Sequence, residues 1–283
     1  MPIRLTLMTV LVMLQGVSCS HRTVAPADST GTEDANAQAV SASASVREEF
    51  RPFSFAVAAD PHLRQGADKL DPVAEQIKAL PPERKPQFLL ICGDLGAEHL
   101  PQAVKAFDIP VHVTPGNAES VEDRALLRTT FADDFKGKDF YSFEHNGCRF
   151  ISLCTAVAND HVGHLSSEDI TPHTGQSAWF EKELAVPSTH TFVFGHIPPH
   201  PKAKDAYMYV GQNDSRFMNN MIRRFRPTAL FFGHQHHRRR FTIGDSEVFV
   251  VRSCSHNMKD EPAGFLLVHV QTDGIATEFI KIR

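Results

Sequence analysis

Five short apolar segments of the sequence are each followed directly by side chains that bind metal ions in proteins. In chain order these side chains are Asp60 and His62, then Asp94, Asn117 and His196, and finally His234 and His236. Imidazole, carboxylate and amide oxygen together suit divalent or trivalent transition metals such as Zn, Mn or Fe. Seven ligands exceed what one tetrahedral ion uses, so the pattern predicts two ions that share a carboxylate, an arrangement typical of displacement at phosphorus.

The residues next to these ligands favour a crowded site. Gly directly precedes the ligand after four of the five segments, and Gly permits a sharp turn and a close backbone approach. The first and the last ligand pairs have i, i+2 spacing, which in an extended segment places both side chains of a pair on one face. His237 would then point away from His236, so we leave His237 out of the predicted site.

The elements that must position the ligands follow from the apolar pattern. The five segments are predicted strands, at residues 53–59, 88–92, 110–114, 191–194 and 229–232. Helical patterns at 70–80, 101–107 and 120–135 separate the early strands, and this alternation predicts parallel pairing. Ligands of open α/β sheets bind beyond the carboxyl ends of the strands, so five strand ends are expected to meet at one place.

The second half of the chain has a different pattern. Residues 140–143 and 148–154 predict a hairpin that turns at Asn146 and Gly147, and a helix is expected at 175–184. Four further segments, 241–243, 248–252, 265–270 and 276–282, predict antiparallel strands. Two packed sheets with helices outside are the simplest architecture that accommodates all of these elements.

The ordered motifs resemble those of the calcineurin-like metallophosphoesterase family. They are Asp60-x-His62, Gly93-Asp94, Gly116-Asn117, Gly195-His196 and Gly233-His234-x-His236. The resemblance implies an α/β fold, a four-layer α/β/β/α sandwich of two mixed sheets, with two transition metal ions. It also implies hydrolysis of a small phosphate ester, and we expect diesters to be slightly favoured over monoesters.

The resemblance also implies a role for each ligand. Its first metal would be held by Asp60, His62, Asp94 and His236. Its second metal would be held by Asp94, Asn117, His196 and His234. Asp94 would bridge the two ions, and Asp94 and Asn117 would therefore stand in the catalytic centre.

The sequence departs from the family pattern at two positions. Ala118 follows the metal-binding Asn, where the family usually has a His that contacts phosphate and helps to protonate the leaving oxygen. Ala97 stands where purple acid phosphatases have the Tyr that binds Fe(III), so this chain is not expected to be one of those. The first departure leaves open an alternative function, a metal-holding but weakly active scaffold or binding module.

Four loop histidines are candidates to replace the missing acid. They are His161, His164, His200 and His256. Any one of them could lie over the metals, and the alternative for each is a solvated loop histidine. The basic run 238–240 could attract an anionic substrate, and its ordinary interpretation is a solvated edge. Tyr207 and Tyr209 could stack on the organic half of the substrate, and their ordinary interpretation is that of exposed loop tyrosines.

The N-terminal 50 residues predict export and a tether. Residues 5–14 are almost wholly apolar and precede small residues and Cys19, a pattern that resembles a bacterial lipobox. Residues 1–19 are therefore an expected export signal, with lipidation at Cys19 or simple cleavage to a secreted form as the two alternatives. Residues 20–50, rich in Ala, Ser and Thr, are expected to be disordered, and 51–283 to form the folded domain. A periplasmic, extracellular or lipid-anchored location follows, with membrane contact only through Cys19.

Composition excludes several other classes of protein. The chain has 283 residues, 42% of them apolar, and a net charge of -4. This is ordinary globular composition, and a mild acidic excess argues against duplex nucleic acid as a partner. Cys148 and Cys154 would lie too far apart along one strand to form a disulfide, and free buried thiols are the favoured state of the four cysteines of the mature chain. The oligomeric state is left open.

Overall fold

The computed structural model describes residues 49–165 and 175–282. The predicted export signal, Cys19 and nearly all of the predicted tether lie outside the described residues, and the boundary at residue 51 stays a prediction. Within the described ranges, no helix combines the length and the apolar character that crossing a bilayer requires.

The first sheet has five strands and is mixed. Its strand order is β11-β10-β1-β2-β3. The bounds are β1 Phe53–Ala58, β2 Leu89–Cys92, β3 Val111–Thr114, β10 Gly264–Gln271 and β11 Gly274–Lys281. The first three strands are parallel, with Ala56 opposite Leu89 and Leu89 opposite Val111, as the early alternation of strands and helices predicts. The two C-terminal strands join antiparallel.

The second sheet has six strands and is also mixed. Its order is β4-β5-β6-β7-β9-β8. The bounds are β4 Tyr141–His145, β5 Cys148–Ser152, β6 Thr191–Phe194, β7 Ala229–Phe232, β8 Arg239–Ile243 and β9 Ser246–Val250. Strands β5, β6, β7 and β9 are parallel, and the two edge strands are antiparallel. The hairpin from β4 to β5 turns at Asn146 and Gly147, both with positive φ, which confirms that prediction.

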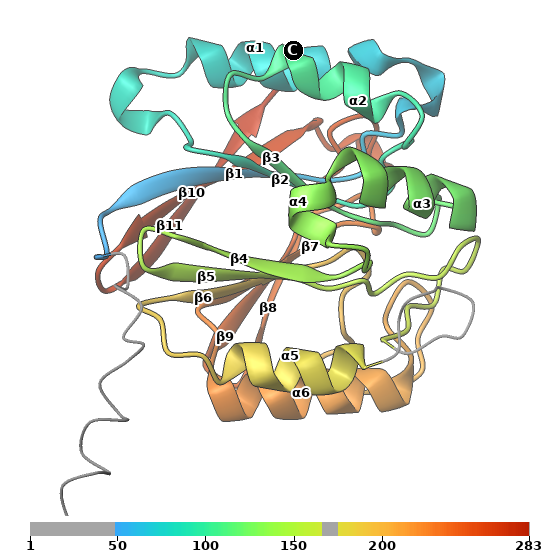
Figure 1. The fold of residues 1–283 in the computed structure, drawn as a ribbon, viewed down its shortest axis with the longest axis vertical. Coiled ribbons are helices and arrows are strands. Elements are labelled where there is room, and N and C mark those ends of the chain that lie inside the picture. Colours follow the sequence, from blue (N-terminus) through green and yellow to red (C-terminus); the bar gives the residue numbers. More distant parts are fainter. Residues whose placement is uncertain (1–48, 166–174, 283) are drawn as a thin grey trace, which may run out of the picture. The chain divides into compact units, whose positions relative to one another are not determined.

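Helices cover the outer faces of the two sheets. They are α1 Asp71–Ala79, α2 Leu100–Ala103, α3 Val121–Thr130, α4 Ala132–Phe135, α5 Gln176–Leu184 and α6 Gln212–Phe225. In Figure 1, α1 and α2 lie on the five-stranded sheet, α5 and α6 lie on the six-stranded sheet, and α3 and α4 lie beside the sheets. This arrangement is the expected four-layer α/β/β/α sandwich.

An aromatic core joins the inner faces of the two sheets. Phe55 of β1 packs edge-to-face against Phe150, Phe192 and Phe231, with ring centroids 5.2, 5.4 and 5.6 Å apart. All four side chains are fully buried. Such rings bury large apolar areas and add edge-to-face attraction, so this cluster fixes how the strands of one sheet lie over those of the other.

Two predicted helices differ from the structure. The helix expected at 120–135 is two helices, α3 and α4, because Phe131 leaves the helical region at φ -113° and ψ 49°. The β-branched pair Thr129 and Thr130 precedes the break, and such residues are weak helix formers. The helix expected at 101–107 is one turn of α-helix followed by a 3₁₀ turn, Val104–Ala106.

The four cysteines of the described residues are buried thiols, as favoured from the sequence. Cys154 lies beyond the end of β5, which stops at Ser152. They are therefore part of the packed interior.

Candidate metal centre

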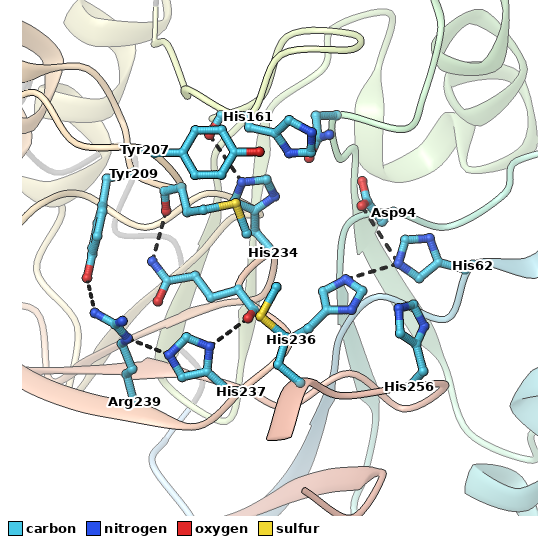
Figure 2. A pocket seen from close by; sticks show the side chains of 14 residues that line it. His62, Asp94, His161, Tyr207, Tyr209, His234, His236, His237, Arg239 and His256 are labelled. Carbon is cyan, nitrogen blue, oxygen red and sulfur yellow. Dashed lines mark hydrogen bonds and ion pairs between the residues drawn. The ribbon is translucent and has the colours of Figure 1, made fainter. Parts of the chain in front are cut away.

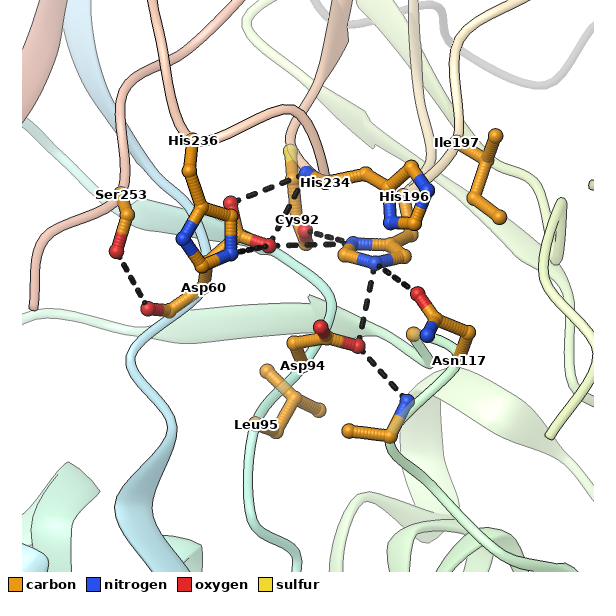
Figure 3. Close-up of polar contacts among 12 residues, drawn as sticks. Asp60, Cys92, Asp94, Leu95, Asn117, His196, Ile197, His234, His236 and Ser253 are labelled. Carbon is orange, nitrogen blue, oxygen red and sulfur yellow. Dashed lines mark hydrogen bonds and ion pairs between the residues drawn. The ribbon is translucent and has the colours of Figure 1, made fainter. Parts of the chain in front are cut away.

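The ends of five strands bring the seven predicted ligands to one place. Asp60 and His62 follow β1, Asp94 follows β2 and Asn117 follows β3, while β6 and β7 of the other sheet lead to the remaining three. Figure 3 shows six of these side chains converging. Backbone hydrogen bonds tie adjacent loops together, from the N–H of Asp60 to Gly93 O at 3.2 Å and from that of His62 to Asp94 O at 2.9 Å.

One group of donor atoms contains Asp60, His62, Asp94 and His236. Its four ligand atoms all lie within 4.8 Å of one another. The Nε2 atoms of His62 and His236 are 3.1 Å apart, and His236 Nε2 lies 3.6 Å from Asp60 Oδ1. These residues come from both sheets, and they are the set that the family resemblance assigns to the first metal.

A second group contains Asp94, His196 and His234, which are all buried. Their ligand atoms also lie within 4.8 Å of one another. His196 Nε2 is 3.1 Å from Asp94 Oδ1 and 3.0 Å from the side-chain oxygen of Asn117, so the amide adjoins this group. Asp94 belongs to both groups, which is the property expected of a bridging carboxylate.

The backbone at the ligands is not extended. The expectation that each i, i+2 pair shares one face of an extended segment is therefore wrong. Asp60, His62, Asp94, His234 and His236 all have left-handed φ values, between 49° and 70°. Non-Gly residues rarely adopt this region, and each such residue costs on the order of 1–3 kcal/mol. The paired ligands therefore meet through tight turns at strand ends and not through the alternation of a pleated strand.

Two glycines permit the close approach expected from the sequence. A Cβ atom on Gly93, which has φ 78°, would lie 2.3 Å from His196 Nδ1. A Cβ atom on Gly116 would lie 2.2 Å from Asp94 Oδ1. Any larger residue at either position would displace a predicted ligand.

A buried carboxylate holds two ligand loops together, and sequence reasoning missed it. Glu119 is fully buried and accepts hydrogen bonds from the backbone N–H groups of Leu95 at 2.9 Å, Gly96 at 3.1 Å and Gly116 at 2.7 Å. The loops after β2 and β3 are thereby fixed to each other. The sequence shows an acidic residue two positions after Asn117, but it does not show which backbone groups that residue would bind.

Buried Arg124 supports the same loop from α3. Its guanidinium donates to the carbonyl oxygens of Gly116 at 2.7 Å and Ala156 at 3.1 Å, and its Nε donates to Glu119 O at 3.1 Å. Helix α3 begins at a complete capping box between Ser120 and Asp123, so its first turn is firmly placed. The Asn117 loop is thus held from two sides.

In the protein without metal ions, burial and the neighbouring charged groups shift the pKa values of the buried ligands in opposite directions. Burial raises the pKa of Asp60 to about 8, with opposition from His196. Burial alone would lower the pKa of His196, but Asp94 and Asp60 raise it to about 9. For Asp94, burial acts upward, but His196 and the Ala118 N–H hold its pKa below its usual range.

Two further imidazoles are kept neutral. Burial, with the charge of His196, lowers the pKa of His234 to about 3. Burial and His62 lower the pKa of His236 to about 4. A neutral imidazole is the form that binds a metal.

This donor set fits two transition metal ions. Asp60 is fully buried and Asp94 is 5% exposed, yet among the described residues neither carboxylate is hydrogen-bonded or ion-paired to Lys or Arg. Their ion-pair partners are histidines, and a metal ion held by deprotonated Asp60, Asp94 and His196 would supply the compensating positive charge. Neutral imidazoles around them suit Zn, Mn or Fe better than Mg or Ca.

A cavity of about 520 Å³ opens beside the ligands (Figure 2). Its lining includes His62, Asp94, Asn117, His234 and His236. A volume of this size accommodates a small organic molecule.

The structure separates the four candidate loop histidines. His256 lines the cavity, and its ring centroid is 4.5 Å from that of His236 and 5.5 Å from that of His62. His161 also lines the cavity, with its ring 5.7 Å from His234. His164 and His200 do not line it.

The two histidines outside the cavity have other neighbours. His164 lies 3.5 Å from the Asp160 carboxylate, and the ring of His200 packs edge-on against Tyr209 at 4.8 Å. His237, which we had left out, does line the cavity, because the turns at His234 and His236 break the alternation on which its exclusion rested.

Comparison with known proteins identifies the family. The family description "Calcineurin-like phosphoesterase" matches residues 53–238, which include all seven predicted ligands. The chain belongs to the calcineurin-like phosphoesterase family. No curated protein matches the chain in sequence.

Solved structures share the fold at low identity. The protein GAP50, titled the anchor in the inner membrane complex of Plasmodium, is 13% identical with a TM-score of 0.54, covering 81% of this chain and 84% of GAP50. A candidate 5′-nucleotidase from Staphylococcus aureus is 12% identical with a TM-score of 0.53, covering 82% and 54% of the two chains. An archaeal phosphodiesterase is 12% identical with a TM-score of 0.46, covering 80% and 99%. The likenesses to GAP50 and to the candidate 5′-nucleotidase show the fold alone.

Proposed function

We propose that this family member is a metal-dependent phosphoesterase that hydrolyses small phosphate esters, with diesters slightly favoured over monoesters. The observation that supports this proposal is the position of Asp94 in two groups of donor atoms at the edge of one cavity. Two ions sharing a carboxylate neutralise charge on phosphoryl oxygens and make a nucleophilic water available at neutral pH.

The chain's own residues orient the donors for this task. His196 Nδ1 donates to Cys92 O at 2.8 Å, which directs Nε2 towards Asp94 and Asn117. His234 Nε2 lies 3.2 Å from His161 O, which leaves Nδ1 for an ion. Hydrogen bonds of this kind fix the ring orientation of metal-binding histidines.

The proton donor for the leaving group is a separate question, because Ala118 has only a methyl group. We propose His256 for this role, since it lines the cavity beside both His62 and His236. His161 lines the cavity beside His234 instead, and His164 and His200 lie outside it. Its side chain is exposed at the mouth, where an imidazole can exchange protons with solvent.

A metal-holding scaffold with little activity is the second candidate function. Ala118 favours it, because the residue next to the metal-binding Asn cannot protonate a leaving oxygen. A general acid typically contributes about 10²–10⁴ in rate, so its loss would leave a slow enzyme. The metal groups themselves are compatible with either function.

Substrates with different leaving groups separate the two functions. If His256 does not protonate the leaving oxygen, the metal-loaded protein should cleave p-nitrophenyl phosphodiesters far faster than alkyl diesters. Ala118→His should then raise activity towards alkyl esters more than towards nitrophenyl esters. If His256 acts as the acid, the parent should show a shallow dependence on leaving-group pKa, and His256→Gln should make it steep. A protein that binds two metals but hydrolyses no ester, with or without Ala118→His, would be the scaffold.

We also propose that the protein acts outside the cytoplasm, as a periplasmic, extracellular or lipid-anchored enzyme. This rests on the apolar run at 5–14 and on Cys19, which lie outside the described residues. The proposed partner is a small phosphate ester, and duplex nucleic acid is not expected.

A further inference from the structure

The cavity has a second wall that belongs to neither group of metal donors. We name it the outer wall and define it by Tyr207, Tyr209, Gln235, His237 and Arg239. It is formed by the loop between β6 and α6, by the turn between β7 and β8, and by Arg239, the first residue of β8. In the view of Figure 2, Tyr209 and Arg239 lie on the opposite side of the cavity from Asp94 and His62.

Arg239 brings an uncompensated positive charge to this wall. Its NH1 donates to the Tyr209 hydroxyl at 2.5 Å, and its Nε donates to His237 Nε2 at 2.6 Å. His237 is held in turn by Gln235 O, 2.7 Å from Nδ1. Neither partner of the guanidinium is a carboxylate, and among the described residues no carboxylate lies within ion-pair distance of it.

Two nearby arginines, Arg240 and Arg252, differ in this respect. Arg240 pairs with Glu247, and Arg252 pairs with Glu261 at 2.7 Å. Asp94 is the sole acidic residue among the described residues that line the cavity, and it belongs to the metal groups. A fixed guanidinium of this kind is suited to a carboxylate or phosphate on a ligand.

Gln235 adds an acceptor that the protein does not satisfy. The residue is 2% exposed, and its Nε2 donates to Met208 O at 2.8 Å. Its side-chain oxygen has no hydrogen-bond partner within the part of the chain that the structure describes. Buried acceptors are nearly always paired, so a ligand with an N–H or O–H group is expected to complete this one.

The mouth of the cavity is apolar and aromatic. Tyr207 is 68% exposed and Met258 is 54% exposed, and both line the cavity. The ring of Tyr207 lies 5.3 Å from that of His161. Exposed aromatic rings at a cavity mouth are suited to stacking on a planar ring of a ligand.

We propose that the outer wall binds the organic half of the ester, and that this half carries a planar, hydrogen-bonding ring and a second anionic group, as a nucleotide does. The second anion would bind Arg239, and the ring would lie against Tyr207. This inference rests on the proposed function, because it names the substrate class of the same cavity.

A matched pair of substrates tests the role of Arg239. Thymidine 3′-(4-nitrophenyl phosphate) is compared with the same ester carrying a 5′-phosphate, so the bond broken and the leaving group are identical. The metal-loaded parent should show at least a roughly tenfold higher kcat/KM for the 5′-phosphorylated ester. Arg239→Gln should bring the ratio of the two kcat/KM values towards 1, and Arg239→Lys should retain part of the preference.

Arg238→Gln is the matched control. Arg238 is the preceding residue, its side chain is exposed, and it does not line this cavity. The substitution removes the same charge and should leave the substrate preference as in the parent. An equal loss in both Gln variants would mean that a general electrostatic effect acts and that Arg239 has no specific role.

Binding without turnover separates this inference from the proposed function. Calorimetry compares thymidine 3′,5′-bisphosphate with thymidine 3′-phosphate, and Tyr207→Ala is tested with the bisphosphate and with its analogue that lacks the base. If the protein prefers the bisphosphate through Arg239 but hydrolyses no ester, the outer wall is supported as a binding site and the proposed esterase function is contradicted. If the protein hydrolyses esters but shows no preference for the second phosphate, or keeps that preference in Arg239→Gln, the proposed binding role of the outer wall is contradicted.

A separate comparison tests whether the planar ring of the ligand stacks on Tyr207. Tyr207→Ala should weaken binding of the bisphosphate about tenfold and leave the analogue without a base nearly unchanged. An equal effect on the two ligands would overturn the stacking role of Tyr207.

Discussion

Asp94 joins the group that contains Asp60 to the group that contains His196, because its carboxylate belongs to both. We therefore expect Asp94→Ala to reduce the metal content from about two ions per chain to well below one after reconstitution with excess Mn, Fe or Zn. Elemental analysis of the purified protein measures this. Asp108→Ala, which removes an exposed carboxylate that belongs to neither group of donor atoms, should keep the parent's content. Two ions retained by Asp94→Ala would contradict the bridge.

Proton release on metal binding follows from the raised pKa values. In the metal-free protein at pH 7, His196 with a pKa of about 9 and Asp60 with a pKa of about 8 hold protons, whereas His234 and His236, with pKa values of about 3 and 4, do not. Ligands bind metals in their deprotonated forms, so loading at pH 7 must release protons, and the release should fade above about pH 9. Titration calorimetry in two buffers of different ionisation enthalpy measures it, and identical heats at pH 7 would refute the expectation.

At the scale of the elements, Glu119 joins the loops that follow β2 and β3. Glu119→Ala would leave three backbone N–H groups without their acceptor, and an unsatisfied buried donor costs about 1–3 kcal/mol. We expect Glu119→Ala to have a lower free energy of unfolding in denaturant titrations and to bind metal more weakly. Glu119→Gln should lie between Glu119→Ala and the parent, because it keeps one carbonyl oxygen. Glu75→Ala, an exposed position of α1, is the control and should be nearly neutral. Unchanged metal affinity in Glu119→Ala would rule out a positioning role.

The sequence predicts the elements and the seven ligands because both depend on local patterns. Apolar runs of strand length end at Asp60 and Asp94, and helical patterns alternate with them, so pairing and the shared sheet edge follow. His237 could not be predicted, because its direction depends on left-handed turns at His234 and His236 that no residue type announces. Arg239 could be suspected of binding anions, but its lack of a carboxylate partner depends on contacts with Tyr209, thirty positions away.

At the scale of the whole molecule, the proposed location outside the cytoplasm depends on the N-terminal segment. We predict that Cys19 is the first mature residue and carries lipid, because an apolar run and small residues precede it. Intact mass and membrane fractionation of the parent and of Cys19→Ser test this, and the Ser variant should lose both the lipid mass and the membrane association. Equal, fully soluble distribution of the two forms would favour simple secretion.

The two sheets contribute jointly to each group of donors, and this has a consequence for how the protein matures. His62 and His236 face each other at 3.1 Å although 174 positions separate them along the chain. The first sheet alone offers three of the four donors of one group, Asp60, His62 and Asp94, and closing so long a segment around an ion before the sheets dock would be entropically unfavourable. We therefore expect both groups of donors to be complete only after the two sheets have docked.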